Sequence, residues 1–320
     1  MKRLIALILV VVFALAFVAA CDSDGGVKTY KVGVAIYKYD DNFMTLYREE
    51  IIAYFKTLET EDVKYDVIMV DSRGDMATQT EQVDSFIAQK VDVMIINLVQ
   101  STSANIITEK AKAANIPVVY INREPSTEDM NAWDRITYVG ADARQSGTIQ
   151  GEIIANLPSR GDADGDGVVR YVMIMGDPEN VDAQYRTEFS IKALTDAGIE
   201  VENLFQQRGD WEQAKGRELA ATALAQFGAA IDVIFCNNDG MAMGAMQAIS
   251  TAGRTVGQDI YLVGVDAIPE AMDAVRDGLM TGTVLNDHIG QSHAAVDAAV
   301  RFIKGETVNK FYIIDYKAVS

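Results

Sequence analysis

Short runs of apolar, largely β-branched residues alternate along the chain with amphipathic stretches. The runs are KVGVAIY (31–37), KYDVIMVDS (64–72), VDVMIINLV (91–99), IPVVYIN (116–122), ITYVGAD (136–142), VVRYVMIMG (168–176), IDVIFCNND (231–239), IYLVGVDA (260–267) and GTVLND (282–287). Several are apolar at consecutive positions, which is typical of strands buried on both faces. The stretches between them, such as 44–58 and 212–227, place apolar residues at helical spacing. The alternation predicts an α/β protein with doubly wound parallel sheets, and 320 residues are enough for two cores.

Polar side chains close one predicted strand after another. Because ligands of parallel sheets collect beyond the carboxyl ends of the strands, these residues are candidates for one site. A single polar ending is a turn signal, whereas six endings together indicate a binding constellation. The residues concerned are Asp41, Asn97, Asn180, Asp182, Arg186, Asn238, Asp266 and Asn286.

The side chains of this constellation offer hydrogen-bond acceptors, donors and mixed groups. A neutral polyhydroxyl ligand needs such a mixture, because each hydroxyl both donates and accepts. A phosphate or carboxylate ligand would need a cationic or glycine-rich cradle, and the sequence contains neither GxxxxGK[ST] nor a GxGxxG that opens a helix. Aromatic rings can cover the flat C–H faces of a sugar, and Phe43 and Trp211 are the candidates. On the residues alone, ordinary packing of Tyr37, Tyr39 and Phe43 beside a solvated Asp pair stays open.

The N-terminus has the features of a bacterial secretion signal. Lys2 and Arg3 precede an apolar stretch (4–18), and Val18-Ala19-Ala20-Cys21 resembles the lipobox of bacterial lipoproteins. We therefore expect a signal peptide (1–20), a lipid on Cys21 that anchors the chain to a membrane, and a polar tether (21–27). An uncleaved membrane anchor is the alternative, although the apolar stretch is short for a span. The net charge of −18 argues against nucleic acid as a partner.

Several motifs together resemble the bacterial galactose/glucose-binding proteins, which are the receptors of sugar ABC importers. They are VAIYKYDDNFM, INLV, VVYINREPS, YVGADARQSGTIQG, NNDGMAMGA, VGVDAIPEA and GTVLND, in the family's order over most of residues 30–300. The resemblance implies a type I periplasmic binding protein fold, with two lobes joined by a three-strand hinge. It implies an N-terminal lobe of 28–122 plus 287–313 and a C-terminal lobe of 123–286 plus 314–320. It also implies a monomer outside the cytoplasm, with no enzymatic activity, that passes a monosaccharide to an ABC permease.

The resemblance further assigns contacts to glucose or galactose. Phe43 and Trp211 would cover opposite faces of the pyranose, and polar side chains would bind its hydroxyls. One position departs from the family, which commonly has His before PDA, whereas this chain has Asn180 before VDA. The choice between glucose and galactose therefore stays open. The N-terminal lobe would contribute Tyr37, Asp41, Phe43 and Asn97, and the C-terminal lobe Asn180, Asp182, Arg186, Trp211, Asn238, Asp266 and Asn286.

The segment DADGDGVVR (162–170) resembles a calcium-binding loop. Asp162, Asp164 and Asp166 would occupy the first, third and fifth positions, and Val168 would contribute its carbonyl at the seventh. The family completes this loop with a distant Glu, and the matching residue here is Asp232. Arg170 at the ninth position is no ligand, and an acidic surface turn is the alternative.

Three other functions have weaker support in the sequence. An enzyme would need a catalytic motif, and His288 and His293 lie in none; the adjacent Asp40 and Asp41 are a poor glycosidase pair because neighbouring residues point different ways. A sugar-responsive repressor would need a helix-turn-helix where the signal peptide lies. A sugar sensor that serves a chemotaxis or signalling receptor would use the same lobes, so the sequence does not distinguish it from a transport protein.

Cys236 lies in an apolar run and is predicted to be a packed, unreactive thiol.

Overall fold

The computed structural model describes residues 26–320. The predicted signal peptide, the lipidated Cys21 and residues 22–25 of the predicted tether lie outside the described residues. Over the described range, the helices are all too short or too polar to cross a bilayer.

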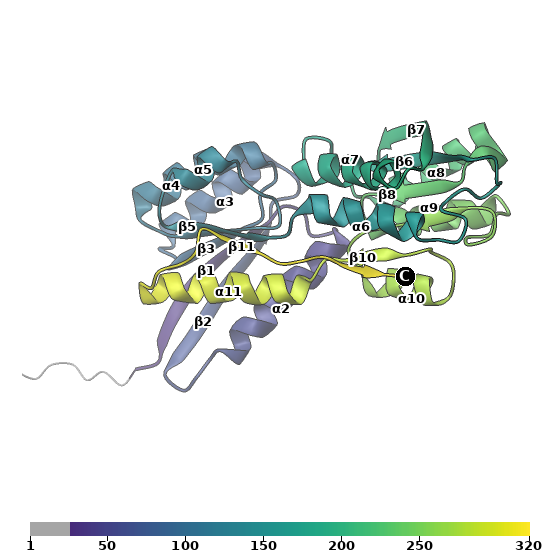
Figure 1. The fold of residues 1–320 in the computed structure, drawn as a ribbon. Helices are drawn as coiled ribbons and strands as arrows, with labels where there is room; N and C mark the ends of the chain where they lie inside the picture. The colour runs from purple at the N-terminus through teal and green to yellow at the C-terminus, as the bar shows by residue number, and fades with distance from the viewer. Residues whose placement is uncertain (1–25) are drawn as a thin grey trace, which may run out of the picture.

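The N-terminal lobe is built on a parallel six-stranded sheet in the order β11-β5-β4-β3-β1-β2. Helices lie on both faces of this sheet (Figure 1). Its elements are β1 (Lys28–Ile36), α2 (Asn42–Thr57), β2 (Val63–Asp71), α3 (Met76–Ala88), β3 (Val93–Ile96), η1 (Ser101–Ser103), α4 (Ala104–Ala114), β4 (Val118–Ile121), α5 (Thr127–Asn131), β5 (Ile136–Gly140), α11 (His288–Lys304) and β11 (Phe311–Ile313).

The C-terminal lobe has a parallel four-stranded sheet in the order β7-β6-β8-β9. Strand β10 continues this sheet through bridges from Val263 to Gly282 and from Asp266 to Leu285, and it pairs antiparallel with β12. The elements are α6 (Ala143–Ala155), β6 (Val168–Met175), α7 (Val181–Asp196), β7 (Glu200–Arg208), α8 (Gln213–Phe227), η2 (Gly228–Ala230), β8 (Val233–Cys236), α9 (Asp239–Thr251), β9 (Tyr261–Val263), α10 (Pro269–Arg276), β10 (Thr283–Leu285) and β12 (Lys317–Val319). The prediction of two doubly wound parallel-sheet lobes is confirmed.

The consecutive apolar residues of the strands are explained by cores on both faces of each sheet. In β1, Val34 and Ile36 face the core under α2 and α11, while Ala35 between them faces the core under α3 and α4. The C-terminal sheet is covered in the same way by α8, α9 and α10 on one face and by α6 and α7 on the other. Cys236 is buried in β8, and burial raises the pKa of its thiol above the ordinary value. Each lobe therefore has its own cores on both faces of its sheet.

The chain crosses between the lobes in three places, and one predicted crossing is wrong. We expected the first crossing directly after Asn122, with 123–286 in the C-terminal lobe. Instead, β5 pairs with β4 and β11 in the N-terminal sheet, and the crossing follows Gly140. The physical reason is burial, since Tyr138 and Val139 of β5 fill the two N-terminal cores. The other crossings lie between β10 and α11 and between β11 and β12 (Figure 1).

Candidate functional site

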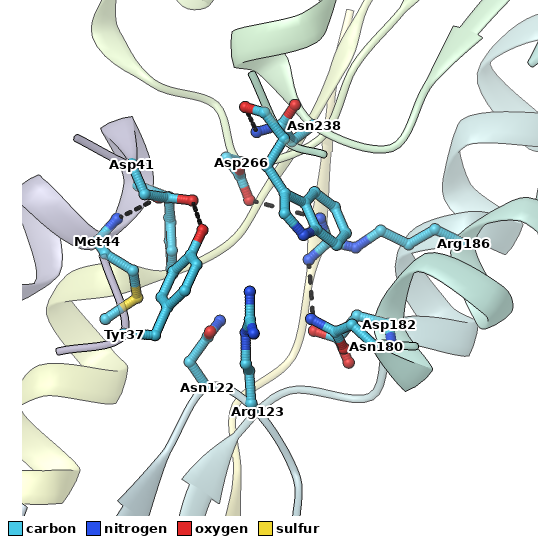
Figure 2. Close-up of a pocket in the computed structure, with 12 residues that line it drawn as sticks. Tyr37, Asp41, Met44, Asn122, Arg123, Asn180, Asp182, Arg186, Asn238 and Asp266 are labelled. Atoms are coloured by element: carbon cyan, nitrogen blue, oxygen red, sulfur yellow. Dashed lines mark hydrogen bonds and ion pairs between the residues drawn. The ribbon is translucent and has the colours of Figure 1, made fainter. Parts of the chain in front are cut away.

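A polar cavity lies between the two lobes. Figure 2 shows Tyr37 and Asp41 on one side of it and Asn180, Asp182 and Arg186 on the other. Each lobe contributes half of the lining residues, so the cavity exists only where the lobes meet. The lining residues are Tyr37, Asp41, Phe43, Met44, Asn122, Arg123, Asn180, Asp182, Arg186, Trp211, Asn238 and Asp266.

The cavity brings together nine of the eleven side chains predicted to contact a ligand. The two aromatic candidates, Phe43 and Trp211, line this one cavity from different lobes. Phe43 also packs edge-on against Tyr47 and His288, with ring centroids 5.9 Å and 6.5 Å away. These neighbours hold the Phe43 ring at the cavity wall.

Asn97 and Asn286 do not line the cavity but brace residues that do. Asn97 is fully buried; its Oδ1 accepts the N–H of Tyr37 at 3.2 Å, and its Nδ2 donates to Asn122 Oδ1 at 3.1 Å. Asn286 donates from Nδ2 to Asp266 Oδ1 at 3.2 Å and accepts from Gln291 at 2.6 Å. Their polar groups are used inside the protein, which accounts for their strand-end positions without a ligand contact.

Three polar residues of the cavity are also N-caps of the helices that begin there. Asp41, Asn180 and Asn238 accept the N–H of Met44, Asp182 and Met241 at 2.8, 2.9 and 3.0 Å. An N-cap uses one side-chain oxygen and leaves other lone pairs or amide hydrogens free. Helices α2, α7 and α9 thus begin at the cavity, and their N-terminal dipoles favour the carboxylates beside them. The local folding signal and the site chemistry coincide in these residues.

Arg186 is the central cation of the C-terminal half of the cavity. Its Nη1 donates to Asn237 O at 2.7 Å, and its Nη2 donates to the Tyr316 hydroxyl at 3.1 Å. The carboxylates of Asp182 and Asp266 lie slightly farther away, at 3.9 and 3.8 Å from the guanidinium nitrogens. Helix α7 carries Arg186 close to α6, because a Cβ at Gly147 would lie 2.9 Å from the Arg186 carbonyl. Close helix packing therefore fixes where the cation sits.

Two acids of the cavity, Asp182 and Asp266, have pKa values that burial shifts. Burial raises the pKa of Asp182 and raises that of Asp266 well above the ordinary range, while Arg186 opposes both shifts. Burial, reinforced by the Asp41 charge, likewise raises the pKa of Tyr37, whose hydroxyl donates to Asp41 Oδ2 at 2.5 Å. Carboxylates in such a buried site need hydrogen-bond donors, and ligand hydroxyls can supply them.

Trp211 is held in place by an unusual backbone and by a glycine. Asp210 and Trp211 both have left-handed φ angles, +52° and +67°, and Asp210 is tied down by Lys215 at 2.6 Å. The indole lies against Gly176, where a Cβ would come within 2.1 Å of the ring. Its Nε1 is buried and has no hydrogen-bond partner among the described residues. Strained backbone at a cavity wall is typical of a functional position.

The sequence prediction missed three lining residues, Met44, Asn122 and Arg123. Arg123 is buried, donates to Val99 O, and stacks its guanidinium 3.8 Å from the centre of the Tyr37 ring. A usable signal existed, because Asn122 and Arg123 directly follow the apolar run that forms β4. With Arg123, the lining has two guanidiniums against the carboxylates of Asp41, Asp182 and Asp266. The two guanidiniums offset most of the charge of the three acids before any ligand binds, which favours a neutral ligand.

A family model for the periplasmic binding protein domain matches residues 32–307. The chain belongs to this family. A D-galactose/methyl-galactoside binding periplasmic protein, MglB of Haemophilus influenzae, is 37% identical over 284 residues, which cover 88% of this chain and 83% of the relative. A putative rhizopine-binding protein of Rhizobium meliloti is 32% identical over 290 residues, covering 90% and 89%. The predicted family resemblance is confirmed.

Solved structures of periplasmic binding proteins share the two-lobed fold. An ABC transporter solute binding protein of Bacillus halodurans with bound myo-inositol is 28% identical, with a TM-score of 0.77 and coverage of 93% and 96%. The periplasmic binding protein component of an arabinose ABC transporter from Shewanella, bound to L-arabinofuranose, is 27% identical, with a TM-score of 0.79 and coverage of 90% and 91%.

The lobes of this periplasmic binding protein touch directly around the cavity. Lys38 Nζ of the N-terminal lobe lies 3.3 Å from Glu212 Oε1 of the C-terminal lobe. Gln100 Nε2 donates to Glu179 Oε2 at 2.7 Å, and Leu46 of α2 packs on the core under α8 and α9. These contacts describe a closed arrangement of the lobes.

The predicted calcium loop of this periplasmic binding protein places three of its five candidate ligands together. One carboxylate oxygen from each of Asp162, Asp164 and Asp166 lies within 4.8 Å of the others. Asp232 serves the loop differently, since its oxygens accept the N–H groups of Ala163 at 3.0 Å and Arg170 at 2.7 Å. The three aspartates fit a calcium ion in donor type and spacing.

Asp166 of that loop makes two further contacts. The Val168 N–H donates to Asp166 Oδ1 at 3.0 Å. The Arg170 guanidinium pairs with Asp166 Oδ2 at 2.6 Å, and this hydrogen bond lowers the pKa of Asp166. A cation at the loop would therefore share Asp166 with Arg170.

Proposed function

We propose that this periplasmic binding protein captures a neutral monosaccharide, glucose or galactose, between its lobes and delivers it to an ABC importer. The observation that carries the proposal is the interlobe cavity, which combines two aromatic rings from opposite lobes, Phe43 and Trp211, with two guanidiniums and three carboxylates. Such a set matches hydroxyls that donate and accept, and it matches the C–H faces of a pyranose. The galactose-binding relative and the arabinose- and inositol-bound structures support a polyhydroxyl ligand.

Glucose and galactose differ at one hydroxyl, so the choice rests on a few polar groups of the cavity rim. Asn180 is one of them, because it stands where the family commonly has His. Its Oδ1 caps α7 by accepting from Asp182, so its Nδ2 is the group available to a sugar. A neutral amide donor at this position favours a sugar whose hydroxyl oxygen is oriented to accept from it, and it does not discriminate by charge. We therefore propose that Asn180 sets the hexose preference.

Ligand capture follows from the two-lobed geometry. A sugar can touch Asp41 and Asp182 together only when the lobes are closed, so binding stabilises the closed form by differential contact. Moving such an equilibrium from 1:99 to 99:1 needs roughly 5.5 kcal/mol. Several hydrogen bonds to buried charged groups, at about 1.5–3 kcal/mol each, supply this amount. The closed shape is then what an importer recognises.

Three further properties belong to the proposal. The lipobox-like segment supports a lipid on Cys21 and a position outside the cytoplasm, tethered to a membrane. The three converging aspartates support a structural calcium ion at 162–166. The family membership supports a binding role without catalysis.

A calorimetric screen of the chain from residue 22 onward tests the proposed function. The ligands are glucose, galactose, ribose and myo-inositol, each with and without calcium. We expect saturable one-to-one binding of glucose or galactose, at least about tenfold tighter than that of ribose, because ribose lacks the exocyclic hydroxymethyl group of a hexopyranose and the contacts which that group makes. Absence of saturable heat with both hexoses would refute the proposal.

A further inference from the structure

Tyr316 lies in the third crossing between the lobes, far from the cavity in sequence. It is 5% exposed and sits between β11 and β12. Its N–H donates to Gln145 Oε1 at 2.9 Å, and Gln145 lies in the first turn of α6, just after the first crossing. Two of the three crossings are therefore joined at Tyr316.

The side chain of Tyr316 reaches the central cation of the site. Its hydroxyl oxygen accepts from Arg186 Nη2 at 3.1 Å, and its ring centre lies 5.9 Å from Arg186 Cζ. Burial raises the pKa of Tyr316 to about 12, so the hydroxyl is neutral at physiological pH. With Nη1 held by Asn237 O, the two terminal nitrogens of Arg186 are both fixed by oxygens outside the ligand space.

The position of the guanidinium matters because two acids stand just beyond hydrogen-bond distance. The nearest oxygens of Asp182 and Asp266 lie 3.9 and 3.8 Å from Arg186. A small rotation would convert these approaches into close ion pairs. A ligand hydroxyl would then have to displace the guanidinium before it could donate to either carboxylate.

We propose that Tyr316 is a positioning residue for the binding site: its hydroxyl holds Arg186 away from Asp182 and Asp266 and so keeps both carboxylates free to accept from ligand hydroxyls. This inference rests on the proposed function for its ligand. It also connects the site to the crossings, because the oxygen that orients Arg186 belongs to a segment that moves when the lobes move. Loss of the hydroxyl leaves the fold intact and lets Arg186 pair with the acids.

The test compares Tyr316→Phe with Tyr261→Phe. The control also removes one hydroxyl from the C-terminal lobe, but its partner is Ser159 Oγ at 2.7 Å, outside the cavity lining. We expect Tyr316→Phe to weaken binding of the preferred hexose about tenfold by calorimetry and Tyr261→Phe to leave it within about twofold. A second variant, Gln145→Ala, loosens the same crossing and should weaken binding in the same direction.

A spectroscopic readout separates positioning from general destabilisation. Trp211 lies 5.7 Å from Arg186 Cζ, and the chain contains two tryptophans, so Trp133→Phe makes Trp211 the sole emitter. In that background, without ligand, Tyr316→Phe should shift the Trp211 emission maximum and Tyr261→Phe should not. Equal affinities and equal spectra for the two variants would overturn the inference. An emission shift in a protein that binds none of the sugars would support the positioning of Arg186 and refute the monosaccharide assignment alone.

Discussion

Asp41 performs two tasks that a pair of substitutions can separate. Its Oδ1 caps α2 by accepting from Met44 N at 2.8 Å, and its Oδ2 accepts from the Tyr37 hydroxyl at 2.5 Å. A carboxylate has about four lone-pair sites, so capacity remains for a ligand hydroxyl in the cavity that Asp41 lines. Asparagine keeps the capping oxygen and removes the charge, whereas alanine removes both.

The structure sets the size of each effect. Loss of the cap in Asp41→Ala should lower the free energy of unfolding by about 1 kcal/mol, and loss of the acceptor for the buried Tyr37 hydroxyl adds about 1–3 kcal/mol. Asp41→Asn avoids the first cost, since Asn caps as well as Asp. Both variants lose a charged acceptor for the ligand, which corresponds to about 1.5–3 kcal/mol, or roughly 10- to 150-fold in Kd.

The assay combines calorimetric titration of glucose and galactose with urea unfolding. Asp75→Asn is the matched control, because Asp75 caps α3 by accepting from Thr78 N at 2.6 Å but does not line the cavity. We expect Asp41→Asn to lose affinity while losing less stability than Asp41→Ala, because it keeps the cap, and Asp75→Asn to bind like the wild type. An Asp41→Asn protein that binds within about twofold of the wild type would refute the assignment of Asp41 as a ligand contact.

Three further predictions concern closure, pH and metal. Lys38→Met should weaken sugar binding about two- to fivefold at low salt and scarcely at 1 M salt, since its half-exposed pair with Glu212 is screened; an effect independent of salt would contradict this. Burial raises the pKa of Asp239 to about 6, so between about pH 4 and 6 the folded protein keeps a proton on Asp239 that the unfolded chain has lost. The free energy of unfolding should therefore fall by on the order of 3 kcal/mol as pH rises from about 4 to 6, and Asp239→Asn should flatten this slope in urea titrations. Calcium should raise the Tm and EDTA should reverse the rise, with Asp162→Asn insensitive to both; a wild-type Tm that ignores both reagents indicates an ordinary acidic turn.

The sequence predicts the fold well because burial on both faces leaves a clear mark on parallel strands. It predicts the strand-end residues for a related reason, since Asp41, Asn180 and Asn238 are helix caps at the carboxyl edges of the sheets. A polar residue at the end of a strand does not by itself reveal whether its side chain faces the cavity or hydrogen-bonds to neighbouring residues of the protein. Asn97 and Asn286 follow their strands in the same way, yet their polar groups are used by neighbouring backbone and side chains.

Features that depend on distant segments are beyond the local pattern. β5 joins the N-terminal sheet because Tyr138 and Val139 fit its two cores, and no signal near Asn122 indicates this. The contact between Tyr316 and Arg186 spans 130 residues and arises only when the last crossing returns to the cleft.

The most direct test of the account is a crystal structure of the mature protein with its preferred hexose. We predict one pyranose between the lobes, with Phe43 and Trp211 on opposite faces and with hydroxyls that donate to Asp41 and Asp182. A sugar bound elsewhere, or one whose faces touch neither ring, would contradict the central claim.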